Sequence, residues 1–249
     1  RQMCIRDSIE GLALRRLTLR CGVRTGDRMV IFETEGDELP ALETDLRVSL
    51  VLLTEDEKTV PLIGLDYLTE EVGGFLFRIS APSFFQTNTA VAEQIVHRVV
   101  EWADLHGTEA VLDAYCGVGL FTAHLAPFAR RVVGIEAHPA AVADAQHNLA
   151  RFPHVEIRAG TVEAVAPTLE EPFEVVVVDP PRTGCSREAL EALLRLAPRR
   201  WIYVSCDPAT LARDARRILD AGYQLREVQP FDMFPQTYHI ETVSLFEKG

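Results

Sequence analysis

The chain reads AVLDAYCGVGLF at residues 110–121. Residues 110–114 form an apolar run with one Asp, as expected for a buried strand, and an apolar stretch with helical spacing follows the loop. The loop holds Gly117 and Gly119, which let the backbone come close to a ligand. Thr122 stands where a dinucleotide-binding loop has its third glycine, and such a loop also expects a pyrophosphate at the helix start. We therefore predict a strand–loop–helix unit that binds a ligand without phosphates.

Outward from this unit, strands alternate with helices. We expect helices at residues 88–102, 120–128, 140–151, 187–196 and 209–221, and strands at residues 110–114, 131–135, 155–158, 173–178, 201–204, 224–229 and 242–246. No helix separates the last two strands, so they are expected to pair as a hairpin. The series predicts an α/β fold with a doubly wound, mostly parallel sheet and an antiparallel edge hairpin.

The first third of the chain has a different pattern. Short apolar or alternating runs lie at residues 12–19, 29–32, 46–53 and 75–79, separated by Gly, Pro and acidic turns. They predict a small antiparallel sheet. We therefore place a β-rich domain at residues 1–82 and the α/β domain at residues 83–249. The chain starts with Arg1 and shows no start signal, so we expect it to be truncated upstream.

Composition narrows the class of protein. With 249 residues, 47% of them hydrophobic, the chain can bury a large core. No apolar run approaches the roughly 20 residues of a membrane span, and no signal segment opens the chain, so we expect a cytoplasmic protein without membrane contact. Five cysteines without C-x-x-C spacing predict neither a disulfide framework nor a metal site.

The net charge of −12 argues against a strong general nucleic-acid binder. Any RNA would have to be held by local patches. The candidates are arginines on two expected helices or beside them: Arg195, Arg199, Arg200, Arg213, Arg216 and Arg217. Basic residues on exposed helix faces are more often solvated surface than binding sites.

Reactive side chains follow the expected strands. Glu136 ends the strand after the glycine loop, where a carboxylate can accept hydrogen bonds from both hydroxyls of a ribose. Asp179 ends the apolar run at residues 175–178 and precedes Pro180-Pro181, whose fixed φ angles make the loop stiff. Cys206 follows the strand at 201–204. Because ligands of open α/β sheets gather at the carboxyl ends of strands, these residues predict an adenosine cofactor beside a reactive thiol.

The residues alone leave alternatives open. Glu241, at the end of FDMFPQTYHIE (residues 231–241), reads as a solvated acid at a strand start. The alternative interpretation of Cys206 is a small buried core residue, which is the commonest state of a free cysteine. Cys116 and Cys185 are expected to serve packing. His239 reads as a surface or hydrogen-bonded histidine rather than as a second base.

Five motifs in a fixed order carry a resemblance to a known family. They are Ser83-Phe84-Phe85-Gln86-Thr87-Asn88, the loop at 113–121, Asp179-Pro180-Pro181-Arg182, Ser205-Cys206-Asp207-Pro208 and the segment ending at Glu241. Over residues 12–249 the chain resembles the S-adenosylmethionine-dependent RNA uracil-C5 methyltransferases. The resemblance implies a Rossmann-like class I methyltransferase domain that transfers a methyl group from S-adenosylmethionine to C5 of a uridine in RNA.

The resemblance also implies roles for single residues. Contacts with S-adenosylmethionine are implied for Gln86, Tyr115, Glu136 and Asp179. Cys206 would be the nucleophile that adds to uracil C6, and Glu241 the base that removes the C5 proton. Leu120 stands where members of the family often have Asn, and because Leu cannot supply that polar contact it is left out of the binding set.

The RNA and the partners are further expectations. Residues 179–184, DPPRTG, resemble the branch that acts on 23S rRNA, while a tRNA target stays open. Many ribosomal members also carry an oligonucleotide-binding barrel and four iron–sulfur cysteines, and because this chain shows neither, we expect no iron–sulfur cluster in it. No obligate protein partner is inferred, and a monomer is expected.

Two other classes of protein fit these motifs less well. RNA cytosine-C5 methyltransferases place a catalytic cysteine after a proline in the fourth-strand loop, where this chain has Pro181-Arg182. A non-catalytic RNA-binding module on the same fold is opposed by the presence of both Cys206 and Glu241. For the target base, we expect a contact from Phe231 or Tyr238. The helix after Cys206 is expected to lower the thiol pKa, with Asp207 opposing it.

Overall fold

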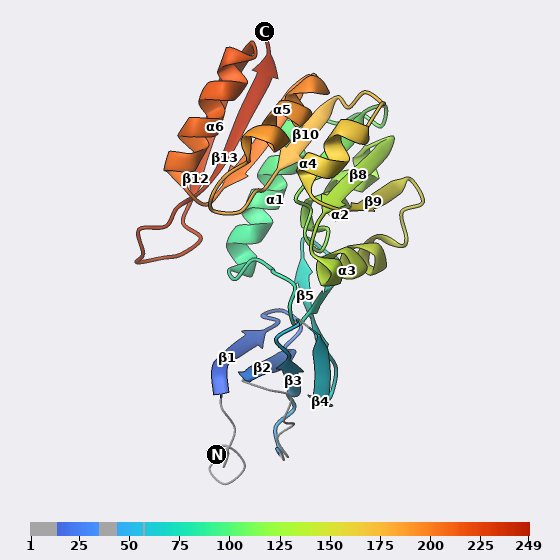
Figure 1. The fold of residues 1–249 in the computed structure, drawn as a ribbon, viewed down its shortest axis with the longest axis vertical. Coiled ribbons are helices and arrows are strands. Elements are labelled where there is room, and N and C mark those ends of the chain that lie inside the picture. The colour runs from blue at the N-terminus through green and yellow to red at the C-terminus, as the bar shows by residue number, and fades with distance from the viewer. Residues whose placement is uncertain (1–13, 35–43, 57) are drawn as a thin grey trace.

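The protein is described by a computed structural model that covers residues 14–34, 44–56 and 58–249. Figure 1 shows a larger α/β part above and a smaller β-rich part below. No helix in these ranges is long and apolar enough to cross a membrane.

A seven-stranded sheet forms the centre of the α/β part, in the order β12-β13-β11-β10-β7-β8-β9. Its strands are β7 (Ala110–Ala114), β8 (Arg131–Glu136), β9 (Val155–Ala159), β10 (Val175–Val178), β11 (Arg200–Ser205), β12 (Tyr223–Phe231) and β13 (Glu241–Lys248). The strands from β11 to β9 are parallel to one another, while β13 pairs antiparallel with both β11 and β12. The predicted parallel sheet with an antiparallel edge hairpin is confirmed. The strand β10 consists of four valines and is fully buried, as expected for a strand at the centre of a parallel sheet.

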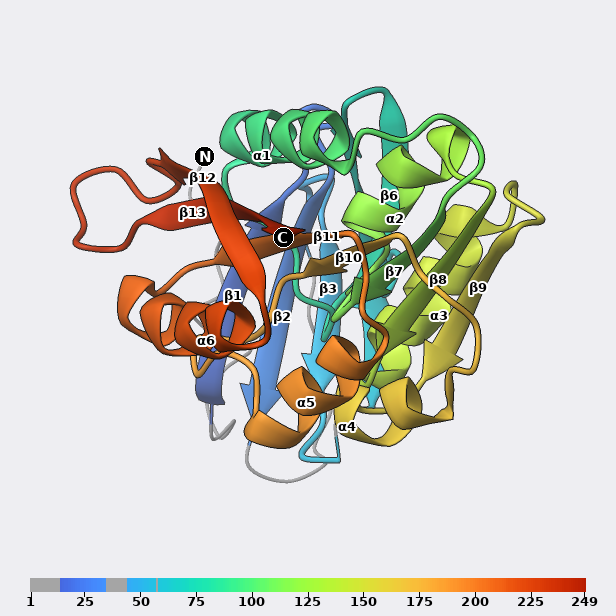
Figure 2. The ribbon, with the colours of Figure 1, turned by 90° about the horizontal axis from the view of Figure 1, so that it is seen from above.

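Helices cover both faces of this sheet (Figure 2). They are α1 (Thr89–Ala103), α2 (Leu120–Leu125), α3 (Pro139–Leu149), α4 (Val162–Val165), α5 (Arg187–Arg195) and α6 (Pro208–Asp220), with 3₁₀ turns η1 (Ala126–Phe128) and η2 (Ala166–Thr168). Apolar residues of α1, α2 and α3 join one core cluster, and those of α4, α5 and α6 join another. The sequence predicts one helix over residues 120–128, but α2 ends at Leu125. Pro127 in η1 lacks the N–H that an α-helix needs.

The β-rich part holds a four-stranded sheet in the order β1-β2-β3-β4 and a two-stranded sheet of β5 and β6. Its strands are β1 (Leu14–Cys21), β2 (Arg28–Thr34), β3 (Ser49–Leu53), β4 (Thr59–Ile63), β5 (Tyr67–Val72) and β6 (Phe75–Ser80). The expectation of a purely antiparallel sheet is wrong, because β2 and β3 run parallel. Alternation of apolar residues is the same in both kinds of pairing, so the local pattern could not distinguish them.

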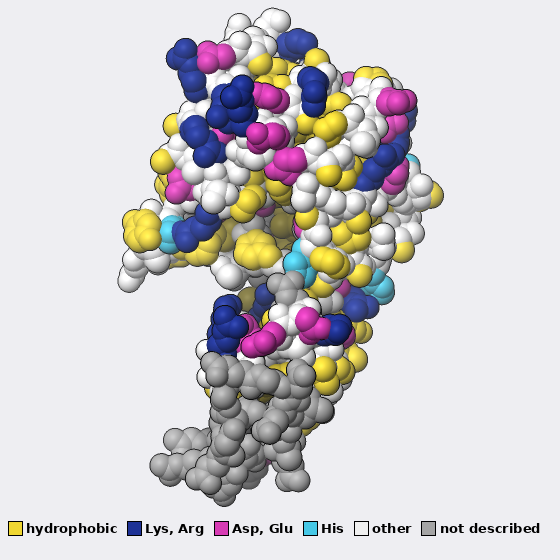
Figure 3. Space-filling view, in the orientation of Figure 1, with side chains coloured by type: hydrophobic (Ala, Val, Ile, Leu, Met, Phe, Trp, Pro, Cys, Tyr) yellow, Lys and Arg dark blue, Asp and Glu magenta, His cyan; other side chains and the backbone are white. Residues whose placement is uncertain are grey.

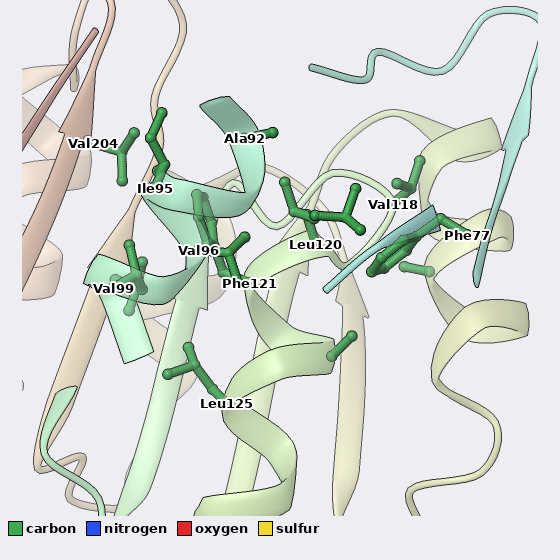
Figure 4. Close-up of a cluster of buried hydrophobic side chains, with 14 of the residues drawn as sticks. Phe77, Ala92, Ile95, Val96, Val99, Val118, Leu120, Phe121, Leu125 and Val204 are labelled. Atoms are coloured by element: carbon green, nitrogen blue, oxygen red, sulfur yellow. The ribbon is translucent and has the colours of Figure 1, made fainter. Parts of the chain in front are cut away.

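One hydrophobic core runs from the β-rich part into the α/β part. Phe77 of β6 belongs to the same buried cluster as Val96 of α1 and Leu120 and Phe121 of α2. Figure 4 shows these side chains gathered between the helices. We propose a domain boundary between residues 82 and 83. The hydrophobic core is continuous across this boundary.

Candidate active site

The carboxyl ends of the parallel strands meet at one edge of the sheet, where a cavity of about 710 Å³ opens. Its wall includes all six residues singled out from the sequence: Gln86, Tyr115, Glu136, Asp179, Cys206 and Glu241. Leu120, which was left out of the binding set, also lines it. Figure 3 shows the hollow on this face, with hydrophobic and acidic side chains along it.

The glycine loop forms the floor of this cavity. Tyr115, Gly117 and Gly119 all have positive φ angles, of 67°, 56° and 92°. Glu136 holds the loop from the next strand: its Oε2 accepts a hydrogen bond from Gly117 N at 2.9 Å, and its Oε1 accepts one from His138 N at 2.7 Å. Each carboxylate oxygen can accept a further bond, so Glu136 can still bind two hydroxyls of a ligand.

Two carboxyl groups lie at the carboxyl ends of neighbouring strands: Asp113 in β7, and the half-buried Asp179 after β10, which lines the cavity. Asp113 is fully buried and accepts a hydrogen bond from Thr122 Oγ1 at 2.6 Å. Burial raises the pKa of Asp113 to about 7. The pKa of Asp179 is also raised, first by burial and then by the charges of Glu241 and Asp113. Such a group of carboxyls favours a ligand that carries positive charge.

Cys206 and Glu241 are brought together by strand pairing. The last antiparallel pair of β11 and β13 is Ser205 with Thr242. Cys206 and Glu241 each lie one residue beyond it, Cys206 just after β11 and Glu241 at the start of β13, and both line the cavity. Separation along the chain therefore says little about their distance in the fold.

Cys206 is half-buried at the start of α6. The pKa of its thiol is raised, first by burial and then by Glu241 and Asp179, whereas Arg182 acts in the opposite direction. The net shift of the thiol pKa is upward, whereas a lowering by the helix was expected. Asp207 caps α6 by accepting hydrogen bonds from Ala209 N and Thr210 N, at 2.9 and 3.0 Å, so its carboxylate meets the positive helix end.

Glu241 is 3% exposed, so the reading of a solvated acid is wrong. Burial raises the pKa of its carboxyl to about 7. A carboxyl with a pKa near neutrality can both take and release a proton at neutral pH.

Asp144, which the sequence analysis missed, fixes the segment that carries Gln86. This fully buried residue of α3 accepts hydrogen bonds from Ser80 N, Ser80 Oγ and Ser83 Oγ at 2.7 to 2.8 Å. From the other side, Arg20 Nη1 donates to Ser83 O at 2.6 Å. The spacing of Asp144 with the buried Ala141 and Ala145 could have shown that an acid lies on the inner face of α3.

Phe231 and Tyr238, the two candidate aromatic contacts for the target base, differ in exposure. Phe231 is 6% exposed and belongs to the core, so it is wrong as a contact for the base. Its position at the end of β12, paired with Glu241, turns it inward. Tyr238 is 91% exposed, and Phe84, which lines the cavity, is 68% exposed.

Several arginines of the candidate basic patches form ion pairs within the fold. Arg200 pairs with Asp104 and Glu247, and Arg216 pairs with Asp220. Arg213 contacts Asp214 and donates to the carbonyl of Thr183. These arginines stabilise neighbouring elements of the fold.

Fold and cavity together place the chain in the class of Rossmann-like methyltransferases. Within this class it belongs to the tRNA (uracil-5-)-methyltransferase family, whose family model matches residues 32–160 and 168–249.

Individual relatives agree with this assignment. An uncharacterised RNA methyltransferase of Gloeobacter violaceus is 44% identical over 95% of this chain and 56% of its own length. One of Halalkalibacterium halodurans is 39% identical over 94% of this chain and 56% of its own length. The crystal structure of Pyrococcus abyssi tRNA (uracil-54, C5)-methyltransferase in complex with S-adenosyl-L-homocysteine superimposes with a TM-score of 0.76 and 31% identity, covering 94% of this chain and 59% of that one. The chain thus spans little more than half the length of each of these three relatives.

Proposed function

We propose that this chain carries the methyl-transfer site of an RNA uracil-C5 methyltransferase. The observation that carries the proposal is the pairing of β11 with β13, which brings a thiol and a buried carboxyl to the wall of one cavity suited to an adenosine ligand. Family membership supports the reaction class.

The residues of the cavity fit S-adenosylmethionine. Glu136 retains acceptor sites for the ribose hydroxyls, and the glycine loop leaves room for a ligand because nothing lies within 4 Å of a Cβ built on Gly117. The carboxyl of Asp179 lines the cavity and favours a cationic ligand, because a nearby positive charge stabilises its ionised form. S-adenosylmethionine would supply a methyl group from a positively charged sulfonium. We propose Gln86, Tyr115, Glu136 and Asp179 as its contacts.

Uracil C5 is a weak nucleophile, and covalent catalysis by Cys206 would activate it. The Cys206 thiolate adds to C6, and the electron pair of the C5–C6 double bond moves toward C5 and the O4 carbonyl. After C5 has been methylated, Glu241 accepts the C5 proton. The electron pair of that C–H bond restores the double bond and expels the Cys206 thiolate.

Arg182 would assist the first step. Its charge lowers the pKa of Cys206 against the effect of burial, so it stabilises the thiolate that must form. The carboxyls of Glu241 and Asp179 oppose thiolate formation. A positive charge in the cavity would reduce this opposition.

A methyl-transfer assay tests the proposal. Wild-type protein, Cys206→Ala and the matched control Cys21→Ala are incubated with methyl-labelled S-adenosylmethionine and RNA, and the nucleosides are separated. We expect label in 5-methyluridine for the wild type and Cys21→Ala, and none for Cys206→Ala. Label in another nucleoside, or an active Cys206→Ala, would contradict the proposal. Cys21 is an exposed cysteine outside the cavity, so its substitution controls for loss of a thiol.

The class of RNA is a finer part of the proposal. The sequence at residues 179–184 supports 23S rRNA, and the 31% identity to a structure named as a tRNA (uracil-54, C5)-methyltransferase supports tRNA. We keep rRNA as the first candidate, acted on in the cytoplasm by a monomer, and tRNA as the second. Mapping 5-methyluridine in both RNAs from cells with and without the gene decides between them.

A further inference from the structure

Three side chains border the cavity beside Cys206. One of them, Arg182, acts on the Cys206 thiol in the mechanism above, but the three together have no role there as a binding surface. Arg182 Nη2 lies 2.5 Å from Nδ1 and 2.7 Å from Nε2 of His239, and the rings of His239 and Tyr238 have centroids 4.1 Å apart. Arg182 comes from the loop after β10, and the other two come from the loop between β12 and β13. We call Arg182, His239 and Tyr238 the rim ledge. In Figure 3 a hydrophobic, a histidine and a basic side chain lie side by side at this edge of the hollow.

The exposure of Tyr238 is not explained by the fold. Its side chain is 91% exposed, whereas Phe234 of the same loop packs against the core. An exposed aromatic ring forgoes the stabilisation that burial of its apolar surface would give. Held against His239 at the rim of a binding cavity, such a ring presents a flat face to a ligand.

Arg182 keeps its charge available. Within the described ranges it contacts the imidazole of His239, and no ion pair with a carboxylate is found for it. This contact joins Arg182 to the loop that carries His239 and Tyr238, and it holds the guanidinium at the rim of the cavity. Arg216, by contrast, is paired with Asp220.

The cavity needs a cation at this position if RNA is to enter. Glu136, Asp179 and Glu241 line it, and the whole chain has a net charge of −12. The net negative charge of the chain repels a phosphate backbone, and Glu241 and Asp179 add to the repulsion when they are ionised. An oriented, unneutralised arginine at the mouth offsets that repulsion where the strand must approach Cys206.

We propose that the rim ledge binds the nucleotide adjacent to the target uridine, with Arg182 on a phosphate and Tyr238 stacked on the neighbouring base. The inference rests on the proposed function. It fits single-stranded RNA, because a uridine whose C6 is to be attacked must leave its stack, which frees the face of the next base. Stacking on an aromatic residue tolerates any base, so the ledge would strengthen binding without selecting sequence.

Binding of a fluorescent nonamer of oligouridine tests the ledge. Fluorescence anisotropy with S-adenosylhomocysteine present gives the dissociation constant without turnover, at a series of salt concentrations. The variants are Tyr238→Ala and Arg182→Gln, with Phe128→Ala and Arg216→Gln as controls, an exposed aromatic and an exposed arginine outside the cavity.

We expect Tyr238→Ala to weaken binding roughly tenfold without changing the salt dependence. Arg182→Gln should weaken binding and reduce the slope of log K against log salt by about 0.7, the value for one phosphate contact on a single strand. Both controls should bind as the wild type does. Ledge variants that bind like the controls, or a wild type that does not bind oligouridine, would overturn the inference.

A separate readout distinguishes failure of the ledge from failure of the proposed function. Labelling of 5-methyluridine by the wild type tests the chemistry and does not depend on where the neighbouring nucleotide lies. Methylation that persists while the ledge variants bind oligouridine normally removes the ledge and leaves the function standing. Absence of methylation removes the function itself.

Discussion

Cys206 and Glu241 line the same cavity, and each lies one residue beyond the pair Ser205–Thr242, the last pair of β11 and β13. Antiparallel register brings together two side chains that are distant along the chain. The arrangement places a thiol just after β11 and a carboxyl at the start of β13, at the wall of one cavity. It also allows the two roles to be separated by substitution.

Replacing Glu241 by Gln should remove the base and leave the nucleophile. We expect kcat to fall by roughly 10²- to 10⁴-fold, the usual contribution of a general base, and the Cys206–RNA adduct to accumulate on ordinary uridine RNA. Denaturing gel electrophoresis detects the adduct. The exposed Glu227 provides a matched control, and Glu227→Gln should be fully active. Rapid turnover by Glu241→Gln would remove Glu241 from this role.

The activity should rise with pH through neutrality. Burial raises the pKa of Glu241 to about 7, so below that pH the group is protonated and cannot accept the C5 proton. The thiol of Cys206, whose pKa is also raised, gains thiolate as the pH increases further. A pH profile of the single-turnover rate should therefore increase with an inflection near pH 7. A rate that falls as pH rises from 6 to 8 would contradict this assignment.

The same buried carboxyls should make the fold less stable as pH rises. In the folded chain Glu241 and Asp113 keep their protons up to about pH 7, while in the unfolded chain they lose them in the ordinary carboxyl range. Because the folded state then binds more protons, the free energy of unfolding falls as pH increases through this interval. Glu241→Gln should reduce that slope in urea unfolding between pH 5 and 7. An unchanged slope would mean that Glu241 ionises normally.

Gly117 tests the glycine loop. Both Gly117 and Gly26 have positive φ angles, 56° and 79°, and neither has an atom within 4 Å of an added Cβ. Alanine at either site should cost about 1 kcal/mol of stability, from backbone strain alone. Gly117→Ala should in addition weaken binding of S-adenosylmethionine, measured by calorimetry, because its Cβ enters the cavity. Equal affinities for both variants would show that no ligand approaches Gly117.

Asp144 should position the segment that carries Gln86. Asp144→Asn replaces an acceptor of Ser80 and Ser83 by a group that donates, so we expect a loss of about 2 kcal/mol of stability. Affinity for S-adenosylmethionine should fall with it. Asp220→Asn, at an exposed ion pair, is the control and should change neither quantity appreciably. A destabilised Asp144→Asn with unchanged affinity would limit Asp144 to a structural role.

The sequence predicted the features that depend on local patterns. The apolar run of β10, the glycine loop before α2 and the position of Cys206 after β11 follow from apolar runs, turn residues and the alternation of strands with helices. Ligand positions at the carboxyl ends of parallel strands follow from the same topology. This is why the residues expected at the site line one cavity.

Features that depend on register or on distant packing were not predictable in the same way. The burial of Glu241 results from the register of β13 on β11, and that of Phe231 from the register of β12 on β13. Parallel pairing of β2 with β3 leaves no local pattern that differs from antiparallel pairing. Asp144 required knowledge that α3 packs against β6, which its helical spacing alone does not give.

Covalent trapping on RNA that contains 5-fluorouridine tests the central claim, that Cys206 is the nucleophile, most directly. Fluorine at C5 cannot be removed as a proton, so elimination of Cys206 stalls after methyl transfer. With S-adenosylmethionine present, wild type and Cys21→Ala should give a complex that survives denaturation, and peptide mapping should place the RNA on Cys206. No complex with the wild type, or an undiminished complex with Cys206→Ala, would contradict the account.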